Sequence, residues 1–495
     1  MKKNDHPFWK DLRRNRVKWL MLVPAAVAVI LMCYIPMAGI VLAFKEYNYH
    51  DGIFGSPWVW LENFRYFFQS GKAWSTTRNT ILYNLAFLCV NTVLQITCAI
   101  MLSEVAGKKF KRITQSVMFL PYFISWVVVG AFVYNLFNYE FGAVNSFLKG
   151  LGLAPIDVYS NKGAWPFILI AFSAFKNVGY GTVMYLASIV NIDDHLFEAA
   201  ELDGANMWQK IRHITLPCIR PTIVILFLLA IGTIMKGDFQ MFWQVTGNNP
   251  MVLETTDVID TYVTRSLLTL QEFGMTSAAG LYQSGISFVL VLVANYFDPA
   301  RRKEDTMHRL KDANGRPMGR DRIIFNIISY VVLTLLSLIC LLPFLLVISG
   351  SFSDQQSIQL HGYQLLPQNF SLDAYKMLFR IPEELLRAYG VTIFVTAAGT
   401  FFGLLFTSMA AFVLANKDFR YRYQVSFFFY FTSIFGGGLV PWYIFNTKYL
   451  HFHNNILSLI IPTVINVTYL LILKSYMMNI PQELYESARL DGAGD

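Results

Sequence analysis

Long apolar stretches alternate with short polar segments along nearly the whole chain of 495 residues. A membrane-spanning helix needs about 20 mostly apolar residues. Strands are not expected, because lipid cannot satisfy an open sheet edge and no alternating barrel pattern is visible. The pattern predicts an all-α polytopic membrane protein with about 10 transmembrane helices, six in the first part and four in the second. The stretches lie near 19–44, 80–103, 114–137, 164–190, 217–236 and 276–297, then near 323–350, 389–415, 424–446 and 455–478.

Lysine and arginine are distributed unevenly between the polar segments. Six alternate segments hold 26 of the 40 basic residues, and the segments between them hold 11. Basic residues concentrate on the cytoplasmic side of membrane proteins. We therefore expect a multi-pass protein of the plasma membrane with a cytoplasmic N-terminus. The basic-rich segments are 1–18, 105–113, 192–220, 298–322, 416–423 and 480–495.

The composition agrees with a protein of the lipid bilayer. Only 15% of the residues are charged and 55% are hydrophobic, whereas soluble domains carry about 25% charge. The net charge of +8 does not predict a nucleic-acid partner, because the basic residues form no continuous face. The eight histidines and five cysteines show no ligand spacing, so no metal site is expected.

The segment 298–322 is charged, contains proline and glycine, and has no apolar periodicity. We interpret it as a cytoplasmic linker between a first unit, 1–297 (core about 75–297), and a second unit, 323–495. The units resemble each other, since "NTILYNLAFLCVNTVLQITCAIML" from Asn79 parallels "VTIFVTAAGTFFGLLFTSMAAFVL" from Val391. Internal repeats of this kind are typical of transporters.

A polar segment, "FEAAELDGANMWQKIRHITLP" (197–217), lies between two apolar stretches on the predicted cytoplasmic side. Its first part favours a short helix, Gly204 favours a turn, and Met207, Ile211 and Ile214 form one apolar stripe of a second helix. This helix-turn-helix is suited to a groove on a partner protein. The alternative is an amphipathic helix in contact with lipid headgroups.

The segment resembles the EAA motif of binding-protein-dependent ABC transporter permeases, whose transmembrane domain is of type I. It departs at Ile211, where the family favours phenylalanine, and a second copy, "YESARLDGAGD", starts at Tyr485. Copies of four motif residues recur 288 positions later, as Glu486, Asp491, Gly492 and Ala493. The matching positions of the first copy are Glu198, Ala199, Ala200, Asp203, Gly204, Ala205, Ile214, Leu216 and Pro217.

Further stretches, such as "FLPYFISWVVVGAFVYNLFNYEF" and "IPQELYESARLDGAG", resemble the permeases of complex-oligosaccharide importers. The resemblance implies a permease that translocates an oligosaccharide, is not an enzyme, and occurs in bacteria. It also implies two kinds of protein partner, cytoplasmic ABC ATPases and an extracytoplasmic solute-binding lipoprotein. In this family the two permeases are usually separate polypeptides, so their fusion in one chain is a departure.

The resemblance implies that the EAA residues, with Ile211, couple the chain to the ATPases. ATP is then used by the partner, and we expect no cofactor on this chain, which has no G-x-x-x-x-G-K-[ST] sequence. The second copy stops within its motif at Asp495. By symmetry with the first unit we expect two further helices to be lacking, and the chain not to complete a transport cycle alone.

Lys176 lies near the middle of the fourth apolar stretch, where charge is costly and marks a substrate path or a buried structural role. One interpretation is that Lys176 and the other candidate residues line a substrate path. The other is that Lys176 makes an ion pair or a helix-end contact, and that the remaining residues serve ordinary helix packing and an aromatic belt. In the outer loop Glu254, Asp257 and Asp260 are candidates for docking a binding protein or for simple solvation. The candidate path residues are Tyr122, Ser125, Trp126, Tyr134, Asn135, Lys176 and Asn177.

The alternative function is a secondary transporter or channel driven by an ion gradient. Such proteins use ionisable residues within the membrane to couple ion and substrate movement. No acidic residue lies convincingly in the middle of an apolar stretch, and the EAA-like segment favours the ABC importer.

Overall fold

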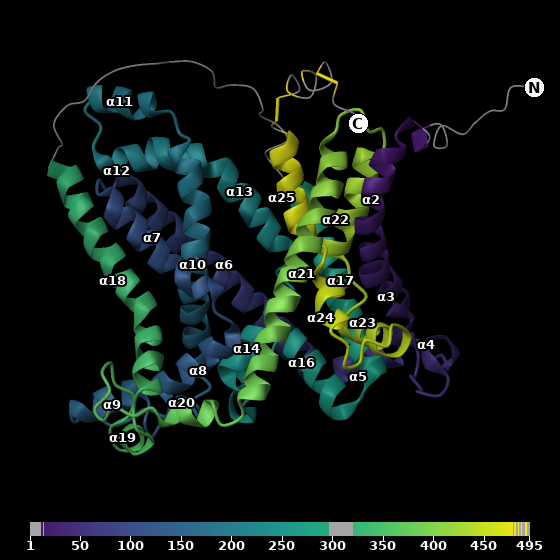
Figure 1. Cartoon of the computed structure of the whole chain (residues 1–495), viewed down its shortest axis with the longest axis horizontal. Helices are drawn as coiled ribbons and strands as arrows, with labels where there is room; N and C mark the ends of the chain where they lie inside the picture. Colours follow the sequence, from purple (N-terminus) through teal and green to yellow (C-terminus); the bar gives the residue numbers. More distant parts are fainter. Residues whose placement is uncertain are drawn as a thin grey trace, which may run out of the picture. The chain divides into compact units, whose positions relative to one another are not determined.

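The computed structural model describes residues 11–12, 14–296 and 320–478, together with the single positions 480, 481, 484, 487, 491 and 492. Helices dominate these residues, whose extended pairings are two isolated bridges, Lys45 with Trp58 and Ser353 with Phe370. Seven of their helices are long and apolar enough to cross a membrane, or up to ten if each of three bent pairs is one span. The predicted all-α polytopic fold is confirmed (Figure 1).

The chain divides into two compact units, and one comprises Lys72–Tyr262 and Val289–Arg380. In this unit the long helix α10 packs along α6 and α7. Gly179 of α10 permits the close approach, because a Cβ there would overlap the carbonyl group of Met118 in α7. Its helices are α6 (Lys72–Glu104), α7 (Lys108–Phe123), α8 (Trp126–Phe137), α9 (Ala143–Gly150), α10 (Trp165–Val190), α11 (Asp194–Leu202), α12 (Met207–Lys210), α13 (Leu216–Gly232), α14 (Phe239–Thr246), α15 (Leu253–Thr256), α18 (Arg320–Ser351), α19 (Gln355–His361) and α20 (Asp373–Leu378).

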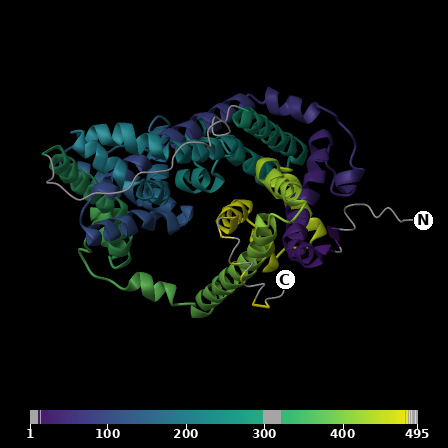
Figure 2. The ribbon, with the colours of Figure 1, turned by 90° about the horizontal axis from the view of Figure 1, so that it is seen from above.

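Helix α18 follows the predicted linker in sequence but packs on α6 and α7, which precede it (Figures 1 and 2). Phe325 of α18 is buried in the cluster that also contains Met118 of α7. Tyr330 of α18 lies with its ring centroid 4.7 Å from that of Phe110, and its hydroxyl accepts a hydrogen bond from the Gly107 N–H at 3.2 Å.

The other unit comprises Met1–Gly71, Val263–Phe288 and Ile381–Asp495. Here the N-terminal helix packs against the helices of the last segment. The Trp19 ring lies 5.2 Å from that of Phe419, and Tyr34 stacks on Phe428 at 4.7 Å. Its helices are α2 (Arg16–Val29), α3 (Ile35–Met37), α4 (Gly52–Gly55), α5 (Glu62–Gln69), α21 (Pro382–Ala415), α22 (Arg422–Ile434), α23 (Leu439–Ile444), α24 (Leu457–Ile460) and α25 (Val467–Met478), with α16 (Ile259–Arg265) and α17 (Phe273–Tyr296) crossing the unit boundaries.

Each compact unit therefore contains segments from both sides of the predicted linker. Helix α2, the first long helix before the linker, packs in the unit that contains most of the chain after the linker. Helix α18, the first long helix after the linker, packs in the unit that contains most of the chain before it. The division into 1–297, 298–322 and 323–495 describes the order of the polypeptide, and it stays a prediction. Each spatial unit thus includes a helix from the opposite part of the sequence. An apolar helix packs where a complementary surface is available, whatever its distance along the sequence.

The third apolar stretch of each half consists of two helices. Helices α7 and α8 meet at 100°, and α22 and the segment 439–449 meet at 105°. Ile124 and Ser125 have extended backbone at the first break, and at the second Gly438 has φ 87°. Broken helices at corresponding positions of two halves are typical of the substrate regions of transporters.

Candidate functional site

The EAA-like segment begins with α11, a short helix capped at both ends. The Asp193 side chain accepts a hydrogen bond from the His195 N–H at 3.1 Å at the N-terminus. At the C-terminus Gly204 has φ 79°, its N–H donates to the Glu201 carbonyl at 3.1 Å, and the Ala205 N–H donates to the Ala200 carbonyl at 2.8 Å. These two bonds and the left-handed residue form a Schellman motif, so the glycine ends the helix as predicted.

Helix α12 starts directly after this turn. Asn206 and Gln209 form a capping box, with hydrogen bonds of 2.9 and 2.7 Å between each side chain and the other's backbone N–H. Met207 and Ile211 are buried, and they belong to the same cluster as Phe325. Two of the three residues of the predicted apolar stripe, Met207 and Ile211, therefore pack on protein, while Trp208 beside them is 65% exposed.

An ion pair joins α11 to α12. The Lys210 Nζ lies 2.5 Å from Glu201 Oε1, and the lysine side chain is only 10% exposed while the glutamate side chain is 39% exposed. With the Schellman turn between them, the two helices form one rigid element. The segment then continues through a π-helical turn (Ile211–Thr215) into α13, with Leu216 and Pro217 exposed at its start.

Helix α11 has no buried residue, and it lies at the end of its unit (Figure 1). Leu202 is 74% exposed, and Glu198 lies with its carboxylate 3.3 Å from the His195 ring. Ala199, Asp203 and Gly204 are also exposed. The element thus presents an exposed rigid helix with both apolar and acidic side chains, suited to a groove on a partner.

The second copy of the motif has the same local backbone structure wherever it is described. In the first copy the N–H groups of Ile192, Leu196 and Asp203 donate to the carbonyls of Ile189, Asp193 and Ala199. At the offset of 288 positions, those of Ile480, Leu484 and Asp491 donate to Met477, Pro481 and Ser487. Gly492, like Gly204, has positive φ, 87°. Glu486 and Ala493 lie outside the described residues.

Lys176 of α10 contacts the break between α7 and α8. Its Nζ donates hydrogen bonds to the carbonyls of Tyr122, at 3.2 Å, and Ile124, and it lies 5.2 Å from the ring centroid of Trp126. These carbonyls have no helical partner at a helix end, so the ammonium group satisfies them. The geometry supports the helix-end interpretation of Lys176.

Residues around this contact are also engaged with protein groups. The Ser125 hydroxyl caps α8 by accepting from the Val128 N–H at 3.4 Å, and the Tyr122 ring stacks on Tyr180 at 4.5 Å. The buried Trp126 donates from Nε1 to Asp238 Oδ2 at 2.7 Å. Asp238 also caps α14, and it was missed from the sequence because nothing links it to positions more than 100 residues earlier.

The remaining path candidates lie farther along the same helices. Asn177 Nδ2 donates to the Ser173 carbonyl at 3.0 Å, within α10. Tyr134 of α8 is half exposed, and its ring lies 5.8 Å from Phe141. Asn135 is half-buried on α8. The structure therefore gathers Tyr122, Ser125, Trp126 and Lys176 at one helix break, while the assignment of any of the seven to a substrate path stays a prediction.

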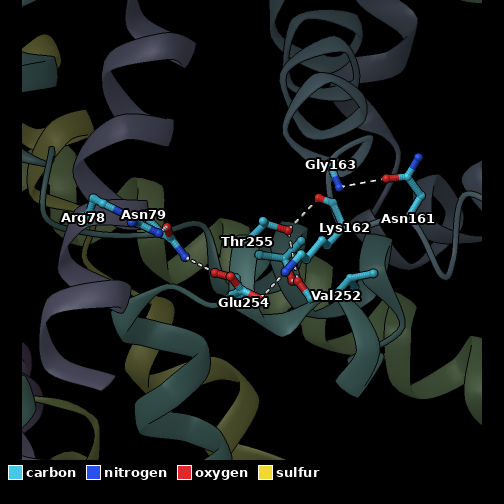
Figure 3. A network of polar contacts seen from close by, with 9 residues as sticks. Arg78, Asn79, Asn161, Lys162, Gly163, Val252, Glu254 and Thr255 are labelled. Atoms are coloured by element: carbon cyan, nitrogen blue, oxygen red, sulfur yellow. Dashed lines mark hydrogen bonds and ion pairs between the residues drawn. The ribbon is translucent and has the colours of Figure 1, made fainter. Parts of the chain in front are cut away.

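The acidic loop around Glu254, predicted to lie outside, is held by a polar network (Figure 3). Glu254 pairs with Lys162 at 2.5 Å, and its backbone carbonyl accepts from Asn79 Nδ2 at 3.2 Å. The Thr255 hydroxyl donates to the Lys162 carbonyl at 2.8 Å. The hydrogen bond and charge of Lys162 hold the pKa of Glu254 below its usual value.

The other two carboxylates of this loop have structural partners. Asp257 is buried and accepts from the Thr261 hydroxyl at 2.7 Å, and Asp260 accepts from the Gly237 N–H at 2.6 Å. The burial of Asp257 leaves it unavailable both for docking and for simple solvation. Asp260 is only partly buried, so its assignment and that of Glu254 stay a prediction.

The fold, its broken spans and the two copies of one motif are those of a membrane transport protein. Residues 95–303 match the family model described as "Binding-protein-dependent transport system inner membrane component". The chain is similar to Protein LplB of Bacillus subtilis (strain 168), with 30% identity over 285 residues, 58% of this chain and 89% of that protein. The chain belongs to this family of ABC-importer permeases.

Other relatives narrow the class to carbohydrate importers. A polygalacturonan/rhamnogalacturonan transport system permease, YteP of the same bacterium, is 31% identical over 57% of this chain and 88% of its own. A crystal structure of a bacterial alginate ABC transporter, in complex with an alginate pentasaccharide-bound periplasmic protein, has a TM-score of 0.55 and 32% identity, covering 60% of this chain and 99% of that chain. The chain is a sugar ABC-importer permease. This class takes the place of the alternative hypothesis, a transporter or channel driven by an ion gradient.

Proposed function

We propose that the chain translocates an oligosaccharide that an extracytoplasmic solute-binding lipoprotein delivers. Cytoplasmic ABC ATPases bind the EAA segments and drive this translocation. The observation that carries this proposal is the exposed, doubly capped α11, joined to α12 by the Glu201–Lys210 ion pair. A rigid helix that moves as one body with the start of a membrane span can transmit force from a soluble partner. A loose loop would absorb the same motion.

The proposed coupling residues of the first EAA segment lie in this rigid element and directly after it. Their roles follow from their positions: Gly204 provides the turn, Met207 and Ile211 anchor α12 in the core, and exposed α11 meets the ATPase. The second copy, around Asp491 and Gly492, offers the same local turn to a second ATPase. ATP and its metal ion bind to the partner ATPases, and this chain contributes no cofactor of its own.

The substrate class rests on the relatives, whose names refer to polygalacturonan and alginate transport. We propose that the path runs beside the broken helices α7–α8, where an interrupted span leaves backbone groups without helical partners. Basic-residue bias supports a cytoplasmic N-terminus, and the B. subtilis relatives support a bacterial plasma membrane.

The test is ATPase capture by the tagged full chain, which needs no completed transport cycle. Uptake of labelled oligogalacturonate and oligoalginate is then measured in membranes that contain the complex and the solute-binding lipoprotein. Leu202→Glu places a charge on exposed α11, and we expect loss of ATPase co-purification and of uptake. The control is Leu153→Glu, which changes another exposed leucine of the same unit, in the loop after α9. ATPase binding and ATP-dependent uptake that survive Leu202→Glu would contradict the coupling role.

A further inference from the structure

An open apolar groove lies between α2 and α22 within one compact unit. It has a volume of about 410 Å³, and six of its seven lining side chains are apolar. The groove runs along helices that belong to membrane-spanning segments, so its natural solvent is acyl chain and not water. Its lining consists of Trp19, Leu22, Val23, Ala26, Gln424, Val425 and Phe428.

One end of the groove carries a concentration of positive charge. Arg16 and Lys18 precede Trp19 on α2, and Arg420, in the turn before α22, and Arg422, its first residue, precede Gln424. These two basic segments meet at one place, because the Trp19 ring lies 5.2 Å from Phe419 and 5.9 Å from Tyr421.

The arginines at this end are positioned by aromatic rings. The Arg422 guanidinium lies 4.6 Å from the centroid of the Tyr423 ring and also donates to its hydroxyl at 2.9 Å. Arg420 is exposed and lies 6.0 Å from the Tyr421 ring. Stacking holds a guanidinium by its face, so its edge can donate to the oxygens of a phosphate.

Asp11, the acidic residue that precedes α2, does not offset the positive charge at this end of the groove. Asp11 is buried, accepts hydrogen bonds from Asn15 at 2.9 Å and from Trp19 Nε1 at 3.2 Å, and lies 3.7 Å from Arg14. Its carboxylate is thus engaged with Arg14 and turned away from solvent. Asp418 is exposed in the turn beside Arg420, and the four cations outnumber it.

We propose that this groove is a binding site for one anionic phospholipid, with an acyl chain between α2 and α22 and the headgroup phosphate on Arg420 and Arg422. Basic pockets between membrane helices select anionic headgroups in this way. A zwitterionic lipid offers the same acyl chain, but its ammonium group opposes the cations. The proposal does not depend on the substrate or on the ATPase.

The first test is native mass spectrometry of the purified full chain with phosphatidylglycerol, cardiolipin or phosphatidylcholine of the same acyl chains. We expect retention of the two anionic lipids over phosphatidylcholine. Arg420→Gln and Arg422→Gln should each weaken that retention about fivefold, because one basic residue near a membrane surface contributes about 1 kcal/mol. The matched controls are Lys111→Gln and Arg112→Gln, each an equal change of one charge, in the basic first part of α7.

The second test fills the groove without changing its charge. Ala26→Trp should reduce retention of phosphatidylglycerol, whereas Val27→Trp, on the next position of α2 but 46% exposed and outside the lining, should not. Equal retention of phosphatidylcholine, equal effects of the charge variants and their controls, or unchanged binding to Ala26→Trp would each overturn the proposal. The arginine variants alter exposed or half-exposed positions, so they keep the test decisive if the tryptophan variant fails to fold.

Discussion

Lys210 Nζ lies 2.5 Å from Glu201 Oε1, across the turn that separates the two helices of the EAA segment. The lysine side chain is only 10% exposed, so removal of this partner would leave it with a poorly solvated, uncompensated ammonium group. The pair therefore decides whether α11 and α12 move together or separately.

Glu201→Gln should loosen α11 while leaving the membrane helices folded. The buried Lys210 loses its counter-charge, and because Glu201 is partly solvated we expect a local loss of about 1–2 kcal/mol. Amide hydrogen exchange in 194–202 should then be about 5–30-fold faster. The double variant with Lys210→Met should recover much of the protection, and unchanged exchange in Glu201→Gln would contradict the role of the pair.

Gly204→Ala should impair coupling through the backbone alone. Gly204 has φ 79°, and a Cβ added there would meet no atom within 4 Å, so the cost is about 1–2 kcal/mol of left-handed backbone and not a clash. Asparagine tolerates this conformation better than alanine. We expect ATP-dependent uptake to fall in the order Gly, Asn, Ala.

Gly152→Ala is the matched control for Gly204. Gly152 also has positive φ, 73°, with open space around it, but lies in the loop after α9. It should suffer the same backbone cost without a defect in ATPase coupling. Equal loss of uptake in both variants would mean that the effect of Gly204 is only on stability.

Lys176→Met should destabilise the break between α7 and α8. The carbonyls of Tyr122 and Ile124 would lose a donor at the helix break, at a cost of about 1–3 kcal/mol. Thermal unfolding in detergent should shift downward, and Lys176→Arg should retain part of the contact. A variant with normal unfolding but a changed KM for the labelled oligosaccharide would instead favour the substrate-path interpretation.

Gly179→Ala should separate α10 from α7. The added methyl group would overlap backbone atoms of Met118 and Phe119, which cannot rotate away as a side chain can. We expect a strong loss of folded protein in a detergent-stability assay. Gly285→Ala in α17 is the control, since nothing lies within 4 Å of its Cβ position, and it should be neutral.

The Lys162–Glu254 ion pair should stabilise the loop around Glu254 only above an acidic pH at which Glu254 is ionised. The pKa of Glu254 is lowered, first by the hydrogen bond from Lys162, so the contribution is fully present above the ordinary value of 4.5 and is lost as the pH falls through the lowered value. Amide exchange in 249–257 should accelerate over that acidic range. Lys162→Gln should remove this pH dependence, and added salt should weaken it because the pair is exposed.

The sequence by itself determined the number and type of the spans and the local form of the EAA segment. A span is a property of about 20 consecutive residues. Ten spans are predicted, and the described residues contain seven helices long and apolar enough to cross a membrane, or up to ten if each bent pair is one span. The turn at Gly204 and its copy at Gly492 depend on neighbours four or five residues away. Such short-range interactions are encoded in order and spacing, so they can be predicted.

Only the tertiary structure decided which helices pack together and which polar groups pair. Helices α2 and α18 are apolar over most of their surface, so their sequence carries little information on the face they bury or the partner they choose. Lys176 with the helix break, Trp126 with Asp238, and Asp260 with Gly237 join positions 23 to 112 residues apart. These contacts follow from how folded surfaces fit, because no periodicity along the chain records a partner at that distance.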